Sequence, residues 1–294
     1  MSNNMSRTNM KKSFYIVASL VLACILFVGC KKWIEEPDPK EDLSYLIKIY
    51  HSYESGVHIF KTTWTYDGYK PMGHQYYEDG QLSSEYKNYS YDGLNASWDC
   101  YNYFSSETIV EHVETEYLDD TFLRIKYQKT TEYSLSDPQS IFIYEIYYVY
   151  EGKKVVGFKR YQNGKLTREG HDFNYDGLHC TYQETRYPSS NSNFVSNERR
   201  YNIVYLDDTY LRVLTSTYTK EVVYDDGTSY TSTVFTSNDY NGKKPIGFQT
   251  FVDGELTEVE RDYQYAGLTC HYFHGYFLDG ELHSTSSHEV KFLE

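Results

Sequence analysis

Two pairs of adjacent aspartates come closest, by type and spacing, to a cation site in this sequence. Asp119-Asp120 recurs as Asp207-Asp208 after a shift of 88 residues, and neighbouring carboxylates can offer oxygen ligands to calcium. Aspartate also favours turns, and no further oxygen ligands stand nearby in the sequence. We therefore expect each pair to form a turn between two strands.

A second candidate for metal binding combines Cys270, His271 and His274. Cysteine and histidine are the usual ligands of zinc. In a strand, however, alternate residues point to opposite faces, so Cys270 and His274 would share one face and His271 would lie on the other. One compact site is not expected, and the sequence predicts neither a metal centre nor a cofactor.

No catalytic signature is present in the sequence. It contains no His-Glu-x-x-His motif, no Gly-x-Ser-x-Gly elbow and no phosphate-binding glycine loop. A carboxylate pair for glycoside hydrolysis would escape notice, because its separation of roughly 5 to 10 Å is spatial rather than sequential. We predict a protein that is not an enzyme, with a glycan-active enzyme as a less favoured alternative, and we assign no catalytic or ligand-binding residue.

Cys30 is the residue for which the sequence predicts covalent chemistry. Lys11 and Lys12 precede an uncharged apolar run from Phe14 to Val28, which is the pattern of a secretion signal. The residues before the cysteine, Phe27-Val28-Gly29, resemble a bacterial lipobox, which implies cleavage before Cys30 and lipid on its sulfur. A plain signal peptide with an incidental cysteine is the alternative.

This pattern divides the N-terminal region into a lipoprotein signal peptide (1–29) and a lipid anchor with a tether (30–56). The tether begins with a charged stretch that contains Pro37 and Pro39, and prolines favour an extended course. The residue after the cysteine is Lys31 and not aspartate, which fits the sorting rule that sends many Gram-negative lipoproteins to the outer membrane. We therefore expect a lipid-anchored protein of the bacterial outer membrane, on its periplasmic or its extracellular face.

The charge of the chain excludes one class of partner. The formal net charge is −14, from 28 basic and 42 acidic residues. Loss of residues 1–29 removes Arg7, Lys11 and Lys12 and no acid, so the mature chain is more acidic still. Binding to phosphate backbones needs clustered lysine and arginine, and we expect no nucleic-acid partner.

Three cysteines remain once Cys24 leaves with the signal peptide and Cys30 is lipidated, and an odd number cannot all pair within the chain. Cys100, Cys180 and Cys270 each share a predicted strand face with a preceding leucine. We expect buried free thiols. A disulfide between Cys180 and Cys270 is the alternative, which requires their Cα atoms to lie within about 7 Å.

Internal repetition decides the predicted architecture. Tyr66-Asp67-Gly68 recurs as Tyr150-Glu151-Gly152 and Tyr240-Asn241-Gly242, at offsets of 84 and 90 residues, and the same offsets relate the segments 91–94, 175–178 and 265–268. Turn signals such as Asn-Gly and Asp-Gly divide each unit into six runs whose polarity alternates with period two. Both features are typical of strands joined by hairpins.

The sequence therefore predicts an all-β fold, an antiparallel meander of about 17 strands over residues 57–294, in two full units and a third partial one. Such a sheet is either curled or spiral and open, or closed into a barrel that has no edges. A membrane-spanning barrel is disfavoured, because the run 166–175 carries Arg168 and Asp172 on one face and Glu169 and His171 on the other.

One segment supports a resemblance to a known family. Gly157 to Thr167 contains a tyrosine, a turn and Gly-x-Leu-Thr, and residues 77–82 and 251–257 match it. This pattern resembles the YD repeat of Rhs-type proteins, and the chain also resembles tyrosine-rich lipoproteins of Bacteroidetes-type bacteria that carry degenerate repeats of this kind. The resemblance implies β-meander sheets that wrap around a space. It implies shells, adhesive stalks or antitoxin-like modules rather than a particular activity.

Tyrosine accounts for 35 of the 294 residues, and its ring with a polar tip suits half-buried strand faces. Rows of such rings can stack on sugars or receive protein side chains, or they can simply cover the sheet. We expect a recognition or scaffold role with a glycan or protein ligand. The alternative is an antitoxin-like immunity protein or a purely structural envelope protein.

Overall fold

A single antiparallel sheet makes up the described part of the chain. The computed structural model describes residues 47–54, 57–68, 70–188, 194–242, 244–278 and 280–292. Within these ranges the chain forms 18 β-strands and no helix, so the all-β prediction is confirmed. The predicted signal peptide (1–29) and Cys30 lie outside the described residues.

The strands follow one another along the chain with short connections. They are β1 (Ile47–Glu54), β2 (Val57–Asp67), β3 (Lys70–Glu78), β4 (Gln81–Asp92), β5 (Asn95–Tyr103), β6 (Thr108–Tyr117), β7 (Ile125–Ser134), β8 (Ile141–Glu151), β9 (Lys154–Gln162), β10 (Lys165–Asp176), β11 (His179–Arg186), β12 (Phe194–Tyr205), β13 (Val213–Tyr224), β14 (Ser229–Asn241), β15 (Lys244–Val252), β16 (Glu255–Ala266), β17 (Thr269–Leu278) and β18 (Glu281–Phe292).

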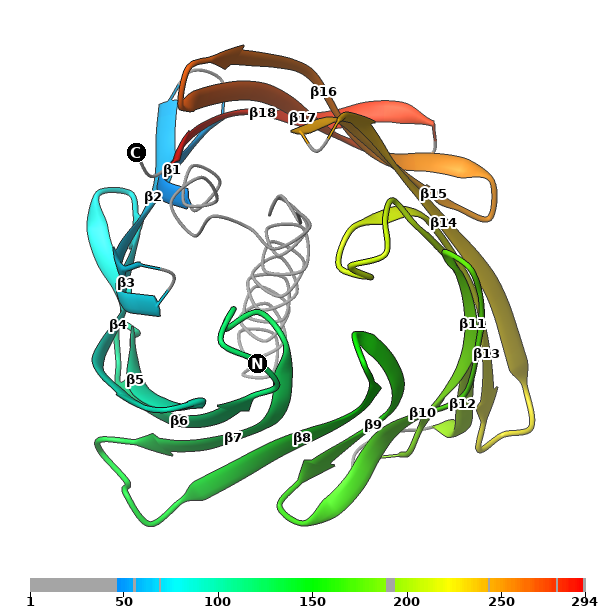
Figure 1. Ribbon diagram of the computed structural model, residues 1–294, viewed down its shortest axis with the longest axis horizontal. Coiled ribbons are helices and arrows are strands. Elements are labelled where there is room, and N and C mark those ends of the chain that lie inside the picture. The colour runs from blue at the N-terminus through cyan, green and yellow to red at the C-terminus, as the bar shows by residue number, and fades with distance from the viewer. Residues whose placement is uncertain are drawn as a thin grey trace, which may run out of the picture.

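Each strand pairs with the next, and β1 pairs with both β2 and β18. The sheet therefore returns on itself and closes into a barrel, seen as a ring of strands in Figure 1. Closure leaves no unpaired sheet edge. Of the two predicted alternatives, open sheet or closed barrel, the structure has the barrel.

The barrel consists of three units of six strands, and the last unit is completed by the first strand of the chain. Tyr117 and Tyr205 donate from their backbone nitrogens to the carbonyls of Leu94 and Leu178, both at 2.9 Å, and Phe292 donates in the same way to Leu268 at 2.8 Å. The same three residues lie opposite Ile125, Val213 and Ile47, each beside a register shift. Strand β1 therefore occupies in the third unit the place of β7 and β13.

This arrangement corrects the predicted boundary between tether and repeat domain. Strand β1 lies inside the range 30–56 that the sequence predicts as anchor and tether, so the sheet begins at Ile47 and not at residue 57. The repeat signal missed this strand because its partners in the third unit lie at the other end of the chain. The predicted partial third unit is complete for the same reason.

Tight turns connect strands at equivalent places in the three units. The β9–β10 hairpin turns at Asn163 and Gly164, with φ of 48° and 75°. Left-handed backbone at both central residues is the signature of a type I′ turn, in which Asn-Gly is strongly preferred. Asp79-Gly80 and Asp253-Gly254 adopt the same conformation in the other units.

Several recurring tyrosines have a structural task. Tyr91, Tyr175 and Tyr265 donate from their hydroxyls to the backbone carbonyls of Pro71, Val155 and Pro245, at 2.7, 2.8 and 2.7 Å. Lys70, Lys154 and Lys244 lie over the same three rings, at 5.0 to 5.1 Å. These tyrosines recur because they tie neighbouring strands together.

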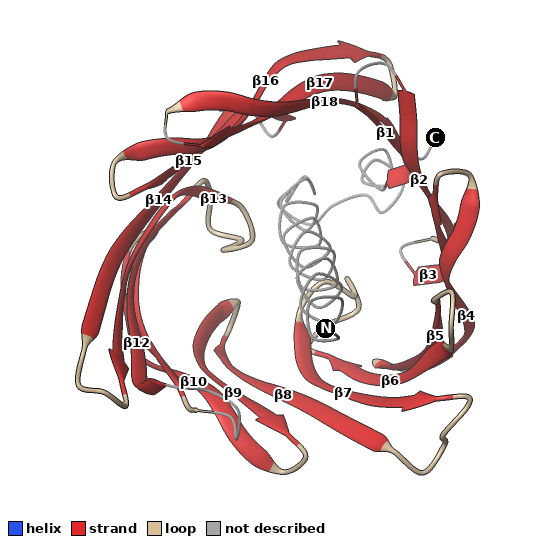
Figure 2. Cartoon of the chain, turned by 180° about the vertical axis from the view of Figure 1, so that it is seen from behind, coloured by secondary structure: helices blue, strands red, loops and turns tan. Residues whose placement is uncertain are grey.

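The two faces of the sheet can be assigned from two loops. The β6–β7 and β12–β13 loops fold inside the ring of strands (Figure 2). Phe122 of the first loop packs edge-on against Tyr91 and Tyr117, and Tyr210 of the second packs against Tyr175 and Tyr205. Because Tyr175 lies directly opposite Cys180, the face that carries this buried cysteine is the inner one.

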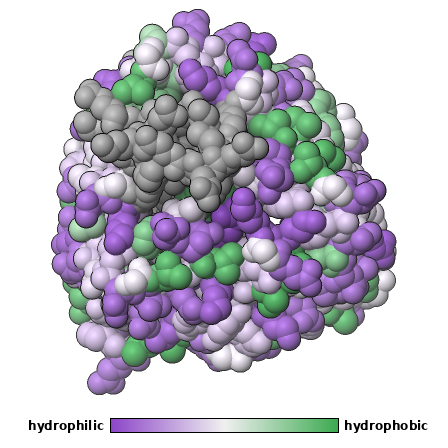
Figure 3. All heavy atoms as spheres, viewed as in Figure 1, coloured by the Kyte–Doolittle hydropathy of each residue, from purple (hydrophilic) through white to green (hydrophobic). Residues whose placement is uncertain are grey.

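The inner face holds most of the buried side chains, and many of them are polar. Ser52, Thr62, His74 and Glu184 are buried together with Cys180. One end of the molecule is mostly hydrophilic, with scattered hydrophobic residues (Figure 3). No helix among the described residues is long and apolar enough to cross a membrane.

Candidate functional site

The first aspartate of each predicted pair serves its own loop. Asp119 accepts hydrogen bonds from the backbone nitrogen of Thr121 at 3.1 Å and from its hydroxyl, and Asp207 does the same for Thr209 at 3.2 Å. Asp120 and Asp208 are exposed. The prediction of a turn between two strands is confirmed.

Each of these loops also buries an arginine, which the sequence reasoning overlooked. Arg124 forms an ion pair with Asp119 at 3.0 Å and donates at 3.1 Å to the backbone carbonyl of Thr209, so the two loops meet. Arg212 is completely buried and lies 2.6 Å from Asp207. Both arginines stand in the repeated motif Thr-x-Leu-Arg, and this recurrence could have indicated them.

The predicted cysteine and histidine positions are confirmed. Cys100, Cys180 and Cys270 are free and buried, and Cys180 and Cys270 belong to different units, on β11 and β17. Cys270 and His274 lie on the inner face and His271 on the outer face, as period two requires. Within the described ranges, no group of three or more histidine, cysteine or acidic side chains is arranged to hold a metal ion.

Stacked rings line part of the inner face. Phe173, Tyr182 and Tyr201 stack in parallel across β10, β11 and β12, with centroids 4.4 Å apart, and Tyr218 follows on β13 at 5.2 Å. In the third unit, Tyr263, Tyr272 and His288 form a similar stack at 4.7 and 4.8 Å. The faces of these rings are covered by one another, so their main contribution is to join the strands.

Two histidines lie within such aromatic surroundings. His74 stacks on Trp64, with centroids 4.8 Å apart, and contacts the tilted ring of Tyr86 at 4.6 Å. Burial lowers its pKa to about 4. Burial, followed by the charge of His274, lowers the pKa of His288 to about 4 as well. Both side chains are therefore neutral in the folded protein at neutral pH.

The charged residues of the inner face differ between units. The first unit carries Glu111 and Glu132, which lie directly opposite each other on β6 and β7. Burial raises the pKa of both carboxyls, and the charge of Glu132 raises that of Glu111 further. In the second unit, the equivalent positions carry Arg199 and Lys220, again directly opposite each other. The same backbone positions thus hold acids in one unit and bases in the next.

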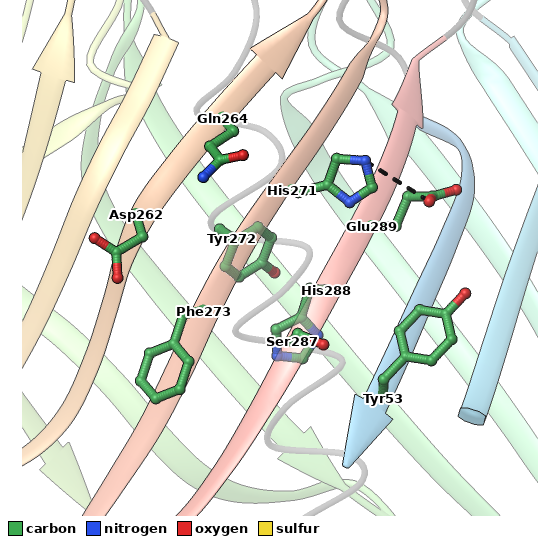
Figure 4. A pocket seen from close by; sticks show the side chains of 9 residues that line it. All are labelled: Tyr53, Asp262, Gln264, His271, Tyr272, Phe273, Ser287, His288 and Glu289. Carbon is green, nitrogen blue, oxygen red and sulfur yellow. Dashed lines mark ion pairs between the residues drawn. The ribbon is translucent and has the colours of Figure 1, made fainter. Parts of the chain in front are cut away.

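A shallow pocket of about 390 Å³ lies where the barrel closes (Figure 4). Its lining comes from β1, β16, β17 and β18, and consists of Tyr53, Asp262, Gln264, His271, Tyr272, Phe273, Ser287, His288 and Glu289. His271 and Glu289 form an ion pair at 3.8 Å, and the histidine is half-exposed. An exposed pair of this kind contributes little stability and does not define a reaction.

Two comparisons with known proteins, with family models and with curated proteins, were negative. No protein-family model matches the chain, and no curated protein matches it. The resemblance to YD repeats and to tyrosine-rich lipoproteins therefore stays a prediction.

The paired aspartates provide a test of the buried arginine. Replacement of Asp207 by asparagine leaves the charge of Arg212 buried without its counter-ion, which we expect to lower the free energy of unfolding by about 2 to 4 kcal/mol, given that the carboxylate is 25% exposed. Asp208→Asn is the matched control and should cost less than about 0.5 kcal/mol. Urea denaturation measures both, and equal losses would contradict the structural role of Asp207.

The burial of His74 predicts a pH dependence of stability. In the folded protein the imidazole of His74 stays neutral down to about pH 4, whereas in the unfolded chain it takes up a proton below its ordinary pKa of 6.5. The contribution of His74 to the free energy of unfolding is therefore fully present above pH 6.5 and is lost as the pH falls toward 4. His74→Phe, which introduces the residue found at the equivalent positions 158 and 248, should remove about 2 to 3 kcal/mol of the loss between about pH 7 and pH 4.

The control for this experiment is His283→Gln, at an exposed position of β18. Urea denaturation across this pH range should show the wild-type slope in the control variant. An unchanged slope in His74→Phe would mean that folding does not lower the pKa of His74.

Proposed function

We propose that the chain is a lipid-anchored recognition protein of the bacterial outer membrane. Cys30 carries the lipid, and the barrel binds a glycan or a protein on its inner face. The protein is not an enzyme in this proposal and needs no cofactor. Whether the barrel faces the periplasm or the exterior is decided by the anchor and not by the fold.

One observation favours ligand recognition over a purely structural role. Polar atoms on the inner face are buried and have no hydrogen-bond partner within the described part of the protein; they belong to Ser52, His74, Trp98, Thr115, Asn197, Arg199 and His274. Each such atom costs about 1 to 3 kcal/mol. A wall with only a structural task would favour apolar side chains there, whereas these donors and acceptors can pair with a polar ligand once the side chains that cover them move aside.

A structural or antitoxin-like role is the second candidate. The recurring tyrosine hydroxyls bond to backbone carbonyls, and the stacked rings cover one another's faces. These tyrosines favour a scaffold over a sugar-stacking platform. We therefore attribute ligand binding to the polar inner side chains and not to the tyrosine rings.

Membrane attachment is tested at Cys30. Cys30→Ala removes the only sulfur to which the proposed lipid is attached, so we expect the chain to move from the membrane pellet to the soluble fraction of fractionated cells. Cys24→Ala, within the apolar run before the proposed cleavage site, is the control and should stay in the membrane. Retention of the Cys30→Ala chain in the pellet would refute the lipid anchor.

Recognition is tested with a glycan array and with a pull-down from envelope extracts, run in parallel with the purified chain. We expect a saturable ligand in one of the two screens. Trp98→Phe keeps an aromatic side chain but removes the unpartnered Nε1 donor of the indole, and should weaken binding about tenfold. Tyr147→Phe, at an exposed position, should bind normally. The absence of a saturable ligand from both screens would favour the structural role.

A further inference from the structure

Five basic side chains gather on the inner face of the second unit, in a chain that is acidic overall. They are Arg160, Arg168, Arg186, Arg199 and Lys220, on the consecutive strands β9 to β13. The cross-strand register places Arg168 directly opposite both Arg160 and Arg186. Arg199 lies directly opposite Lys220. Side chains at such positions are close neighbours, because their Cβ atoms lie about 4.5 to 5.5 Å apart.

On the inner face of these strands, a single carboxylate offsets the positive charge of the five basic side chains. Glu184 is buried and accepts hydrogen bonds from Arg186 and from the hydroxyl of Tyr201, the latter at 3.3 Å, while Arg168 lies 3.9 Å away. The five cations therefore exceed the acids of this surface by four charges. Like charges directly opposite each other destabilise a sheet, so the folded protein bears a cost here.

The pKa values and contacts of the individual cations agree with this excess of positive charge. Burial and the charge of Arg186 lower the pKa of Arg168 to about 10. Burial, with the charges of Arg199 and Arg186, lowers the pKa of Lys220. Arg199 stacks at 5.1 Å on the ring of Tyr218, and its Nε is buried and has no hydrogen-bond partner among the residues that the structure describes.

The fold does not require these charges, because the other units do without them. Positions equivalent to Arg168 hold Ser84 and Glu258, and the first unit has Asn102 in the place of Arg186. Repeats that share a backbone have thus diverged on this inner surface. A costly cluster that the fold can omit is typical of a functional site.

We propose that the inner face of the second unit is a binding site for an acidic glycan, an oligosaccharide that carries carboxylate or sulfate groups. This inference rests on the proposed function and names the ligand class. Four of the five cations are arginines, whose planar guanidinium groups match oxyanions bidentately. The site lies inside the ring of strands, which suits a narrow, extended ligand better than a folded protein. Side chains of Arg168 and Arg186 are 33% and 21% exposed, so a ligand can reach them.

The test uses calorimetric titration of the purified full-length chain with a sulfated oligosaccharide, an oligogalacturonate, a neutral maltooligosaccharide and single-stranded DNA. We expect an acidic glycan to bind, and to bind more weakly at high salt. The combined variant Arg168→Ser and Arg186→Asn, with residues that the first unit holds at these places, should lose affinity at least about tenfold. Arg200→Gln is the control, since Arg200 is exposed on the outer face and its replacement removes a positive charge without changing the inner face.

Each outcome has one meaning. Equal affinity in the combined variant, equal loss in the control, or tighter binding of DNA than of either acidic glycan would overturn the inference. Binding of the neutral glycan alone would overturn it and leave the proposed function standing. If inorganic sulfate raises the melting temperature of the wild type but not of the combined variant, and no glycan binds, an anion site exists and glycan recognition is wrong. A melting temperature of the unliganded variant at or above that of the wild type confirms that the variant folds.

Discussion

Closure of the sheet by its first strand is the constraint on which the rest of the structure depends. Strand β1 pairs with both β2 and β18, and this single strand turns a meander with two exposed edges into a barrel without any. An unpaired edge is a template for association with other chains. Closure also creates a defined interior, and only this interior brings side chains from distant repeats to face one common space.

The three units share a backbone and differ in what they present to that space. Turns, bulges and tyrosine hydroxyl bonds repeat at equivalent positions, and they fix the register of every strand. Register then determines that alternate residues face inward. Once the backbone is secured in this way, inner positions are free to change, and they have changed from acids in the first unit to bases in the second. The chemistry of the protein lies in this divergence, whereas its stability lies in the repetition.

The sequence predicted the all-β meander because Asn-Gly turns, period-two alternation and repeated motifs are local signals. It predicted that Asp119 and Asp207 form turns and that the cysteines are buried and free, for the same reason. The sequence did not predict strand β1, because β1 belongs to the third unit and joins it only when the two ends of the chain meet. Its equivalence to β7 and β13 is therefore not visible along the sequence. The cluster around Arg168 escaped because its successive members are 8 to 21 residues apart in the sequence and come together only through strand pairing. A local turn motif sets the register of its own hairpin, but contacts across five strands also depend on bulges and on pairings over longer loops, which no local motif encodes.

The most direct test is a cross-link between β1 and β18, the first and last strands of the barrel. Tyr53 and Ser287 lie directly opposite each other on β1 and β18, at a separation that a disulfide can span. With Tyr53→Cys and Ser287→Cys combined, oxidation should join these two positions, and peptide mapping should find the bond. Tyr53→Cys combined with Thr233→Cys, on β14, should give no cross-link. Failure of the first pair to join, or equal cross-linking of both pairs, would contradict the closure of the barrel by β1.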